Sequence, residues 1–468
     1  MTLPALNELE SRFVHHAHEG LRFECGRIKV DALAATRDND HDIRMEVVQK
    51  ILSGDGPSVH PGGLRIRYAR ITGSAGQPLC LNGLRLPVGV EFRDCCFQMP
   101  VLAHDAHIPW LNFDDCRVGY LQADRIVVKG SLYLRGLVTT MPHDMGSVRL
   151  LGARIGRNLE LDKACLVNPK GPGLHAEGIS VGRALRIRKA KVDVVCDTGA
   201  VQLVNARIDN DAWIDETHIN NGLGPALNAE GLQVGGSLLL GSGFTATAES
   251  PELGTVHLMS SRVGSRLDLG AGRRYTGIIW GENPAEWKPS NTPATLSNTA
   301  STGLVLDLSC ASTNDLRLPP QVVCEPDDGW CSTGNKVILV GLKYTTLSRE
   351  STHQRWPHLL GHHVDHFEAE PYQHLATVLR GSGQAGEARK LLIELENERH
   401  RWRSRPVSPG SSAWHWTKRI VIRHGYKPGR ALFFLLGVFG FALLLSLAAR
   451  SADWVHRPAI RVEGQATS

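Results

Sequence analysis

The feature that most constrains the fold is an internal repeat. Between Leu64 and Leu269 the sequence returns to a unit in which two apolar residues flank one variable residue, followed by a small residue and then Ile or Val. The unit reads LRIRYARI from Leu64, VRLLGARI from Val148, LHAEGISV from Leu174, VQLVNARI from Val201, LNAEGLQV from Leu227 and VHLMSSRV from Val256. From Val148 onward the starts are 26, 27, 26 and 29 residues apart. A fixed period of this size is the signature of a solenoid.

A second unit follows each start eleven residues later, for example LELDKACL from Leu159 and LRIRKAKV from Leu185. The alternation L-x-L places one side chain inward and the next outward, which predicts short strands. Strands at this spacing can pair only with their equivalents in neighbouring coils. We therefore expect a mainly β protein, a pentapeptide-like parallel β-helix that is right-handed because parallel connections nearly always are.

The ends of such a solenoid need caps, since unpaired strand edges promote aggregation. Residues 42–52 carry Ile43, Val47 and Ile51 at helical spacing and predict an N-terminal capping helix. The sequence divides into an N-terminal helical cap, the solenoid, an irregular insertion, the final solenoid strands, and a linker with a C-terminal helical hairpin. These parts span 1–62, 63–272, 273–303, 304–350 and 351–400.

The C-terminal region predicts a membrane anchor. A basic juxtamembrane segment, 401–430, precedes nineteen uncharged residues at 431–449, close to the ~20 that a transmembrane helix needs. More Lys and Arg precede this run than follow it in the tail, 450–468, so the positive-inside rule places the N-terminal bulk in the cytoplasm. We expect a single-pass protein of the cytoplasmic membrane, with the lipid bilayer as one partner.

Several segments resemble a known group. The pentapeptide-like units, the motif PYQHLATVLRGSGQAGEARKLL at 371–392 and GYKPGRAL at 425–432 resemble a bacterial family of pentapeptide-repeat-like membrane proteins. Members are often labelled membrane-associated oxidoreductases, although the function of the family is uncharacterised. The resemblance implies no catalytic residues, and the chain carries no G-x-G-x-x-G motif between a strand and a helix and no other cofactor signature.

One set of cations recurs at the same place in its units, and Ser180 and Gln233 fill that place in the intervening coils. Alternation would hold the arginines ~10 Å apart, because neighbouring strands lie ~4.8 Å apart. The set forms either a solvated ladder or an anion-binding stripe, and its members are Arg70, Arg117, Arg154, Arg207 and Arg262.

Two further groups are candidate sites. Trp280 and Trp287 lie in the insertion, which is either a binding loop or a loop without a role in recognition. His358, His362 and His366 are spaced by four residues and would line one face of a helix, where they can hold a divalent metal. The alternative for these histidines is a polar linker.

The charge distribution narrows the choice of partners. The net charge of the chain is +5, yet nine Lys or Arg and no Asp or Glu lie between Arg399 and Arg430. The basic excess therefore belongs to one short segment. Nucleic acid is for this reason not expected as a partner. We interpret the chain as a membrane-tethered scaffold for a protein partner of unknown identity, without an evident cofactor. The alternative is an enzyme at the inner membrane face.

Overall fold

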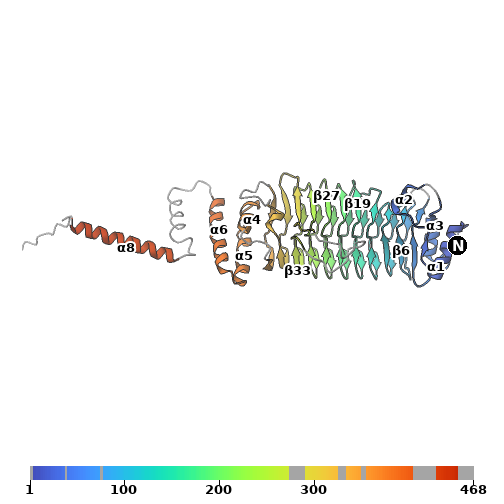
Figure 1. Ribbon diagram of the computed structural model, residues 1–468, viewed down its shortest axis with the longest axis horizontal. Coiled ribbons are helices and arrows are strands. Elements are labelled where there is room, and N and C mark those ends of the chain that lie inside the picture. Colours follow the sequence, from blue (N-terminus) through green and yellow to red (C-terminus); the bar gives the residue numbers. More distant parts are fainter. Residues whose placement is uncertain are drawn as a thin grey trace, which may run out of the picture. The chain divides into compact units, whose positions relative to one another are not determined.

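The protein is described by a computed structural model of residues 4–36, 39–73, 77–272, 290–324, 334–348, 355–403 and 428–451. Two compact units divide the chain at residues 378 and 379. The first contains a stack of short parallel strands that runs between helices α1 and α3 at one end and α4 at the other (Figure 1). The predicted mainly β, parallel solenoid is confirmed.

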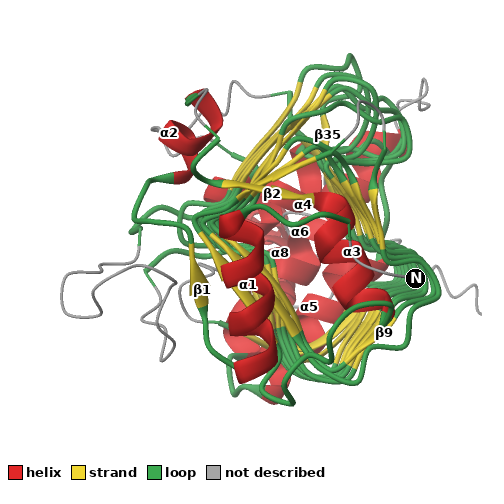
Figure 2. Ribbon diagram, turned by 90° about the vertical axis from the view of Figure 1, so that its right-hand side faces the viewer, coloured by secondary structure: helices red, strands yellow, loops and turns green. Residues whose placement is uncertain are grey.

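Four ladders of strands surround the core, because each coil contributes four short strands and every pairing is with a neighbouring coil. Seen along the stack, the strands of successive coils superimpose, and α1 and α3 lie across its end (Figure 2). Ladder I contains β5 (Leu79–Cys80), β8 (Val101–Leu102), β12 (Leu121–Gln122), β16 (Val148–Arg149), β20 (Leu174–His175), β24 (Val201–Gln202), β28 (Leu227–Asn228), β32 (Val256–His257), β35 (Leu304–Asp307) and β37 (Lys336–Ile338).

Ladder II follows ladder I in each coil. It contains β9 (His107–Ile108), β13 (Val127–Val128), β17 (Arg154–Ile155), β21 (Ser180–Val181), β25 (Arg207–Ile208), β29 (Gln233–Val234) and the first halves of β33 (Arg262–Asp268), β36 (Ser312–Arg317) and β38 (Lys343–Leu347). Ladder III contains β1 (Phe23–Glu24), β3 (Leu64–Arg67), β6 (Val90–Arg93), β10 (Leu111–Asp114), β14 (Leu132–Tyr133), β18 (Leu159–Glu160), β22 (Leu185–Arg186), β26 (Ala212–Trp213), β30 (Leu238–Leu239) and the second halves of those three strands. The long strands join ladders II and III into one sheet.

Ladder IV completes the coil. It contains β2 (Asp42–Arg44), β4 (Arg70–Thr72), β7 (Cys96–Phe97), β11 (Arg117–Val118), β15 (Val138–Thr139), β19 (Cys165–Asn168), β23 (Lys191–Val194), β27 (His218–Asn221), β31 (Thr245–Ala248) and β34 (Thr295–Asn298). β34 lies in the region predicted to be an irregular insertion, 273–303, so the described end of that region rejoins the solenoid. Residues 273–289 lie outside the described part of the chain.

The inward positions of the ladders form one apolar core of Leu, Ile, Val and Ala, as the L-x-L alternation predicted. Phe92, Phe97 and Phe113 pack together inside, with ring centroids 5.0 to 5.6 Å apart. The chain turns sharply after each strand of ladder III, where Lys163 and Lys189 adopt positive φ angles of 60° and 53°. These left-handed residues let successive turns stack in the same conformation.

Buried asparagines hold the wider loops on one edge. Asn221, at the end of β27, donates hydrogen bonds of 2.8 Å to the carbonyl oxygens of Cys196 and Pro225 and accepts one of 3.0 Å from the amide of Cys196. Asn168 bridges the carbonyls of His143 and Pro172 in the same way. The Gly/Pro segments that begin with these residues therefore have their backbone groups satisfied from inside the solenoid.

The N-terminal cap contains α1 (Glu8–Glu19), α2 (Val30–Ala35) and α3 (Met45–Ser53). The predicted capping helix over 42–52 is partly wrong, because Asp42–Arg44 form strand β2 paired with β4. The Glu10 carboxylate accepts hydrogen bonds from the amide of Asn7 and from Nε and Nη2 of Arg44, at 3.2, 2.8 and 2.5 Å. This contact ties α1 to the start of α3.

The remaining helices are the 3₁₀ turn η1 (Pro320–Val322), α4 (Trp356–His362), α5 (Glu370–Gly381), α6 (Ala385–Arg403) and α8 (Pro428–Ser451). Helices α5 and α6 occupy the residues predicted to form two helices of a hairpin. The prediction of a transmembrane helix over 431–449 is not supported, since no helix in the described residues is long and apolar enough to cross a membrane.

Candidate functional site: a cationic groove and a Cys–His cluster

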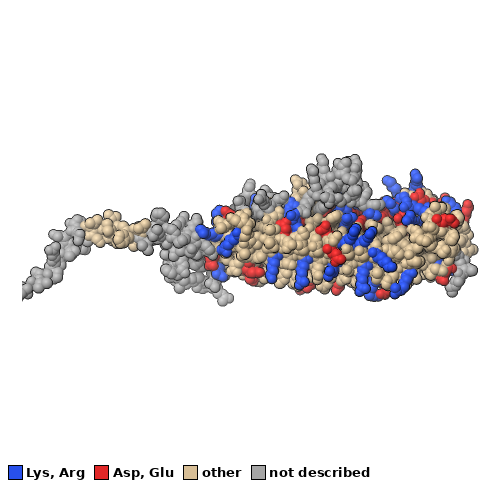
Figure 3. Space-filling model, turned by 90° about the horizontal axis from the view of Figure 1, so that it is seen from below, with Lys and Arg blue, Asp and Glu red and all other residues tan. Residues whose placement is uncertain are grey.

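A groove of about 770 Å³ runs along ladder II near the C-terminal end of the solenoid. Its floor is crossed by β25, β29, β33, β36 and β38, and the N-terminal part of α5 contributes Glu370 and His374 to its lining. Lys and Arg side chains recur along the solenoid in the view of Figure 3. All lining residues belong to the first compact unit, so the groove is formed by the solenoid and the start of α5.

The register of ladder II arranges the cations of the groove. Arg154 pairs with Ser180, Ser180 with Arg207, Arg207 with Gln233, and Gln233 with Arg262. The alternation of Arg with neutral residues predicted for Arg154, Arg207 and Arg262 is therefore confirmed. The ladder continues to Ser312 and then Lys343, which extends the pattern by one further cation that the sequence analysis missed.

Arg70 and Arg117 do not belong to this row, and their inclusion in it was wrong. Both lie on ladder IV, where each is in register with Cys96. Arg70 Nε binds Asp42 at 2.6 Å, and Arg117 Nη1 binds Asp31 at 2.6 Å, so each is neutralised by a residue of the N-terminal cap. These two arginines fasten the cap to the solenoid.

The groove cations differ in their surroundings. The Arg207 side chain is exposed and pairs with Asp209 of its own strand end, at 3.2 Å. Arg262 and Lys343 are exposed and form no ion pair with any residue that the structure describes. The polar groups beside them include Gln233, Ser312 and Asn314. This face therefore offers two unneutralised positive charges among hydrogen-bonding side chains.

Helix α5 closes the groove at the last strand. His374 Nε2 lies 2.9 Å from the carbonyl oxygen of Tyr344 and 3.1 Å from its amide nitrogen, and the two rings meet edge to face at 4.6 Å. Glu370 accepts a 2.5 Å hydrogen bond from the amide of Gly341. Burial raises the pKa of the Tyr344 hydroxyl, which stays neutral. A single ring nitrogen either donates or accepts, so His374 satisfies one of these two backbone groups of the edge strand β38, and Glu370 satisfies the amide of the turn before it.

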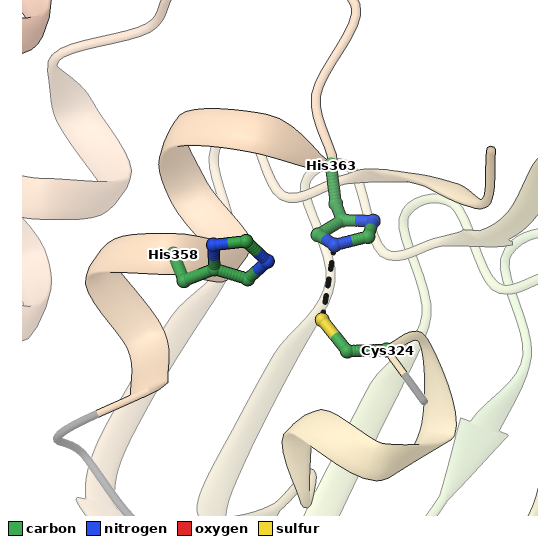
Figure 4. A group of neighbouring side chains, drawn as sticks. All are labelled: Cys324, His358 and His363. Atoms are coloured by element: carbon green, nitrogen blue, oxygen red, sulfur yellow. Dashed lines mark hydrogen bonds between the residues drawn. The ribbon is translucent and has the colours of Figure 1, made fainter. Parts of the chain in front are cut away.

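A second cluster lies at the C-terminal end of the solenoid. Cys324 follows η1, while His358 lies on α4 and His363 directly follows that helix. Their ligand atoms all lie within 4.8 Å of one another, and both imidazoles face the thiol (Figure 4). Cys324 Sγ and His363 Nε2 are 3.0 Å apart. Cys324 and His363 are buried, whereas His358 is half-buried.

The surrounding structure orients His363. Its Nδ1 lies 2.7 Å from the carbonyl oxygen of Asn335, which accepts only from a protonated nitrogen and so leaves the lone pair on Nε2. Burial lowers the pKa of His363. Burial, followed by the neighbouring His362 and His363, also lowers that of His358. Both imidazoles are therefore neutral near pH 7, the form that binds a metal.

The three-histidine face predicted from the sequence is wrong in its composition. Helix α4 ends at His362, so His366 is not on it and remains exposed. His362 stacks on His358 with ring centroids 4.5 Å apart but is not among the three clustered ligands. The structure instead brings His358 together with His363 and Cys324. Trp280 and Trp287, the other predicted site, lie outside the described residues.

Comparison with known proteins adds no relative. No family model matches the chain, and neither a curated protein nor a solved structure is significantly similar to it.

Proposed function

We propose that this protein is a non-enzymatic scaffold that binds an acidic, extended segment of a partner protein in the groove of ladder II. The row of Arg207, Arg262 and Lys343 carries this proposal. Charge complementarity selects an anionic ligand and speeds its association. Solenoid faces are suited to such binding because they are long and rigid.

The spacing of the cations indicates the conformation of the ligand. Arg262 and Lys343 are two strands apart on one ladder, which is ~10 Å. A polyproline II segment rises ~3.1 Å per residue with three residues per turn, so every third side chain faces the same way at a spacing of ~9.3 Å. An extended segment with an acidic residue at every third position therefore matches the row.

The proposal also includes attachment to the cytoplasmic membrane through 431–449, with the solenoid in the cytoplasm. It rests on the uncharged run in the sequence and on the cations that precede it. Among the described side chains of α8, Leu436, Phe439 and Leu444 are exposed and apolar, by 56%, 67% and 65%. Such a helix needs an apolar environment to cover these side chains.

The groove is tested with two fluorescent peptides of equal charge. One repeats Glu-Pro-Pro, and the other contains the same residues with all glutamates adjacent. We expect the repeating peptide to bind more tightly to the full-length protein. Because exposed ion pairs contribute up to about 1 kcal/mol, R262Q and K343Q should each weaken binding by up to about fivefold.

The matched control is R125Q, which removes an exposed arginine that pairs with Asp105 away from the groove. It should leave the affinity unchanged. Equal binding of both peptides would refute the register argument, and unchanged affinity in the double variant R262Q/K343Q would refute the groove as the binding site. Full-length protein purified in mild detergent serves for all variants.

A further inference from the structure

We infer that Cys324, His358 and His363 bind a divalent metal ion of the zinc class, which clasps helix α4 to the last turn of the solenoid. This site is independent of the proposed groove. The inference rests on the donor set, the preorganisation of the donors and their place in the fold.

The donor set fits zinc. A thiolate and two imidazoles are the ligands that Zn²⁺ takes in proteins, and three of them leave one tetrahedral position for water or another group. Zinc–ligand bonds of ~2.3 Å to sulfur and ~2.0–2.1 Å to nitrogen, at a tetrahedral angle, place the sulfur and nitrogen atoms ~3.6 Å apart. The 3.0 Å between Cys324 Sγ and His363 Nε2 requires only a small opening to admit the ion.

The second layer around the cluster is already in place. His363 Nδ1 is held by the carbonyl of Asn335 at 2.7 Å, the arrangement that orients metal-binding imidazoles. Asn335 in turn donates from Nδ2 to the carbonyl oxygen of Val323, beside Cys324, at 3.1 Å. The backbone carbonyl of His363 accepts a 2.7 Å hydrogen bond from Val337 of β37. Asn335 therefore holds His363 directly and holds the backbone next to Cys324.

The place of the cluster explains what a metal would do. Cys324 belongs to the turn after β36, whereas His358 lies in the first turn of α4 and His363 directly follows that helix. Helix α4 has little apolar packing of its own, since it has seven residues, of which only Trp356, Leu359 and Leu360 are buried. Metal binding energy adds directly to folding energy when the ligands come from separate segments. A bound ion would therefore stabilise the cap over the last coil.

The alternative interpretation is a catalytic cysteine, because Cys324 Sγ and His363 Nε2 are only 3.0 Å apart. Cys324 is only 7% exposed, which limits access of a substrate to its thiol. The second imidazole, His358, also has no role in a cysteine–histidine pair but completes a three-ligand set. The metal site explains all three residues.

The test uses full-length protein carrying a purification tag without histidine. The metal content is measured by mass spectrometry, the metal is removed with a chelator, and Co²⁺ is titrated in before competition with Zn²⁺. We expect one ion per chain and a sulfur-to-cobalt charge-transfer band. C324S should abolish the band, and H363Q should weaken binding by at least about 100-fold, beyond the 10- to 100-fold typical of losing a supporting residue.

Two matched controls separate the site from other donors. C310S removes an exposed cysteine, and H366Q removes an exposed histidine that lies beyond α4, and neither should change the titration. Hydrogen exchange of the wild-type protein gives a second measurement that does not depend on a variant folding: Zn²⁺ should slow exchange across residues 356–363. A cobalt spectrum without the sulfur band, or exchange that Zn²⁺ does not alter, would overturn the proposal.

Discussion

The fully buried ion pair between Asp162 and Arg188 provides the sharpest test of how the solenoid is held together. The two side chains are 1% and 0% exposed, and Arg188 Nη2 lies 2.5 Å from Asp162 Oδ2. Asp162 Oδ1 also accepts from Nε and from the backbone amide of Arg188, both at 3.1 Å. A single carboxylate thus accepts hydrogen bonds from two nitrogens of a buried guanidinium and from one backbone amide of the next coil.

Removing the carboxylate in D162A leaves the guanidinium buried without its main counter-charge. Breaking such a pair destabilises a protein by about 3–5 kcal/mol, whereas replacing both partners with apolar residues of similar volume is near neutral. We expect D162A to show this loss and D162L/R188M to recover most of it. The difference between the single and double variants measures the coupling of the pair.

The assay must be local, because a solenoid does not unfold in one step. Hydrogen exchange of the full-length protein reports the opening of individual coils. A loss of 3–5 kcal/mol corresponds to exchange faster by about two to three and a half orders of magnitude in the coils around 159–194. D105N, which breaks an exposed pair with Arg125, is the control and should change little. Equal effects of D162A and D105N would refute the reasoning.

Three further predictions concern the edges of the solenoid. N221A should destabilise the coils around it by roughly 2–4 kcal/mol because buried backbone groups lose their partners, and N220A, at an exposed neighbour, should not. Hydrogen exchange of these coils compares the two variants. G235A places a Cβ 2.1 Å from a backbone oxygen of the preceding coil and should cost about 1–3 kcal/mol in the same assay, while G222A meets only an ordinary contact at 3.6 Å and should be tolerated. Burial favours the neutral form of Glu10, but the hydrogen bonds to its carboxylate outweigh burial and lower its pKa. The stabilising effect of Glu10 is therefore complete above its ordinary pKa of 4.5 and is lost as the pH falls below that value. An acid titration followed by circular dichroism should show a smaller loss of structure with falling pH in E10Q than in the wild type.

The sequence predicted the class of fold correctly but not the phase of its coils. The unit at Leu64 was grouped with those at Val148 and Val201, yet Leu64 pairs with Val90 on ladder III, whose later members include Leu159. Some units of ladders I and III continue alike, through a small residue into a cation and an apolar residue, as at Ala153–Ile155 and Ala190–Val192, so half a coil resembles the other half. The coils that begin at Val90 and Leu111 are also shorter, at 21 residues. Because of this change in period, the sequence analysis assigned Arg70 and Arg117 to the wrong ladder.

The buried charges were readable in the sequence but were missed. The fourth residue of the ladder III unit is Asp114, Arg135, Asp162, Arg188 and Asp215 in successive coils, so its sign alternates. Alternation of sign between neighbours on a ladder indicates cross-strand pairing. The Cys–His cluster could not be found by spacing, because Cys324 is 39 residues from His363 and the two meet only where α4 folds back over the last coil.

The two ends of the solenoid protect their strand edges with different side chains and strands, and this difference leaves charge on one part of ladder II. At the N-terminal end, strands β1 and β2 pair onto ladders III and IV, and cap carboxylates neutralise Arg70 and Arg117. At the C-terminal end, side chains replace the pairing strands: His374 binds one backbone group of Tyr344 in β38, and Glu370 accepts a hydrogen bond from the preceding turn. No described carboxylate pairs with Arg262 or Lys343, so that part of ladder II keeps its positive charge. The cap that protects the last edge therefore also leaves the groove available for an acidic ligand.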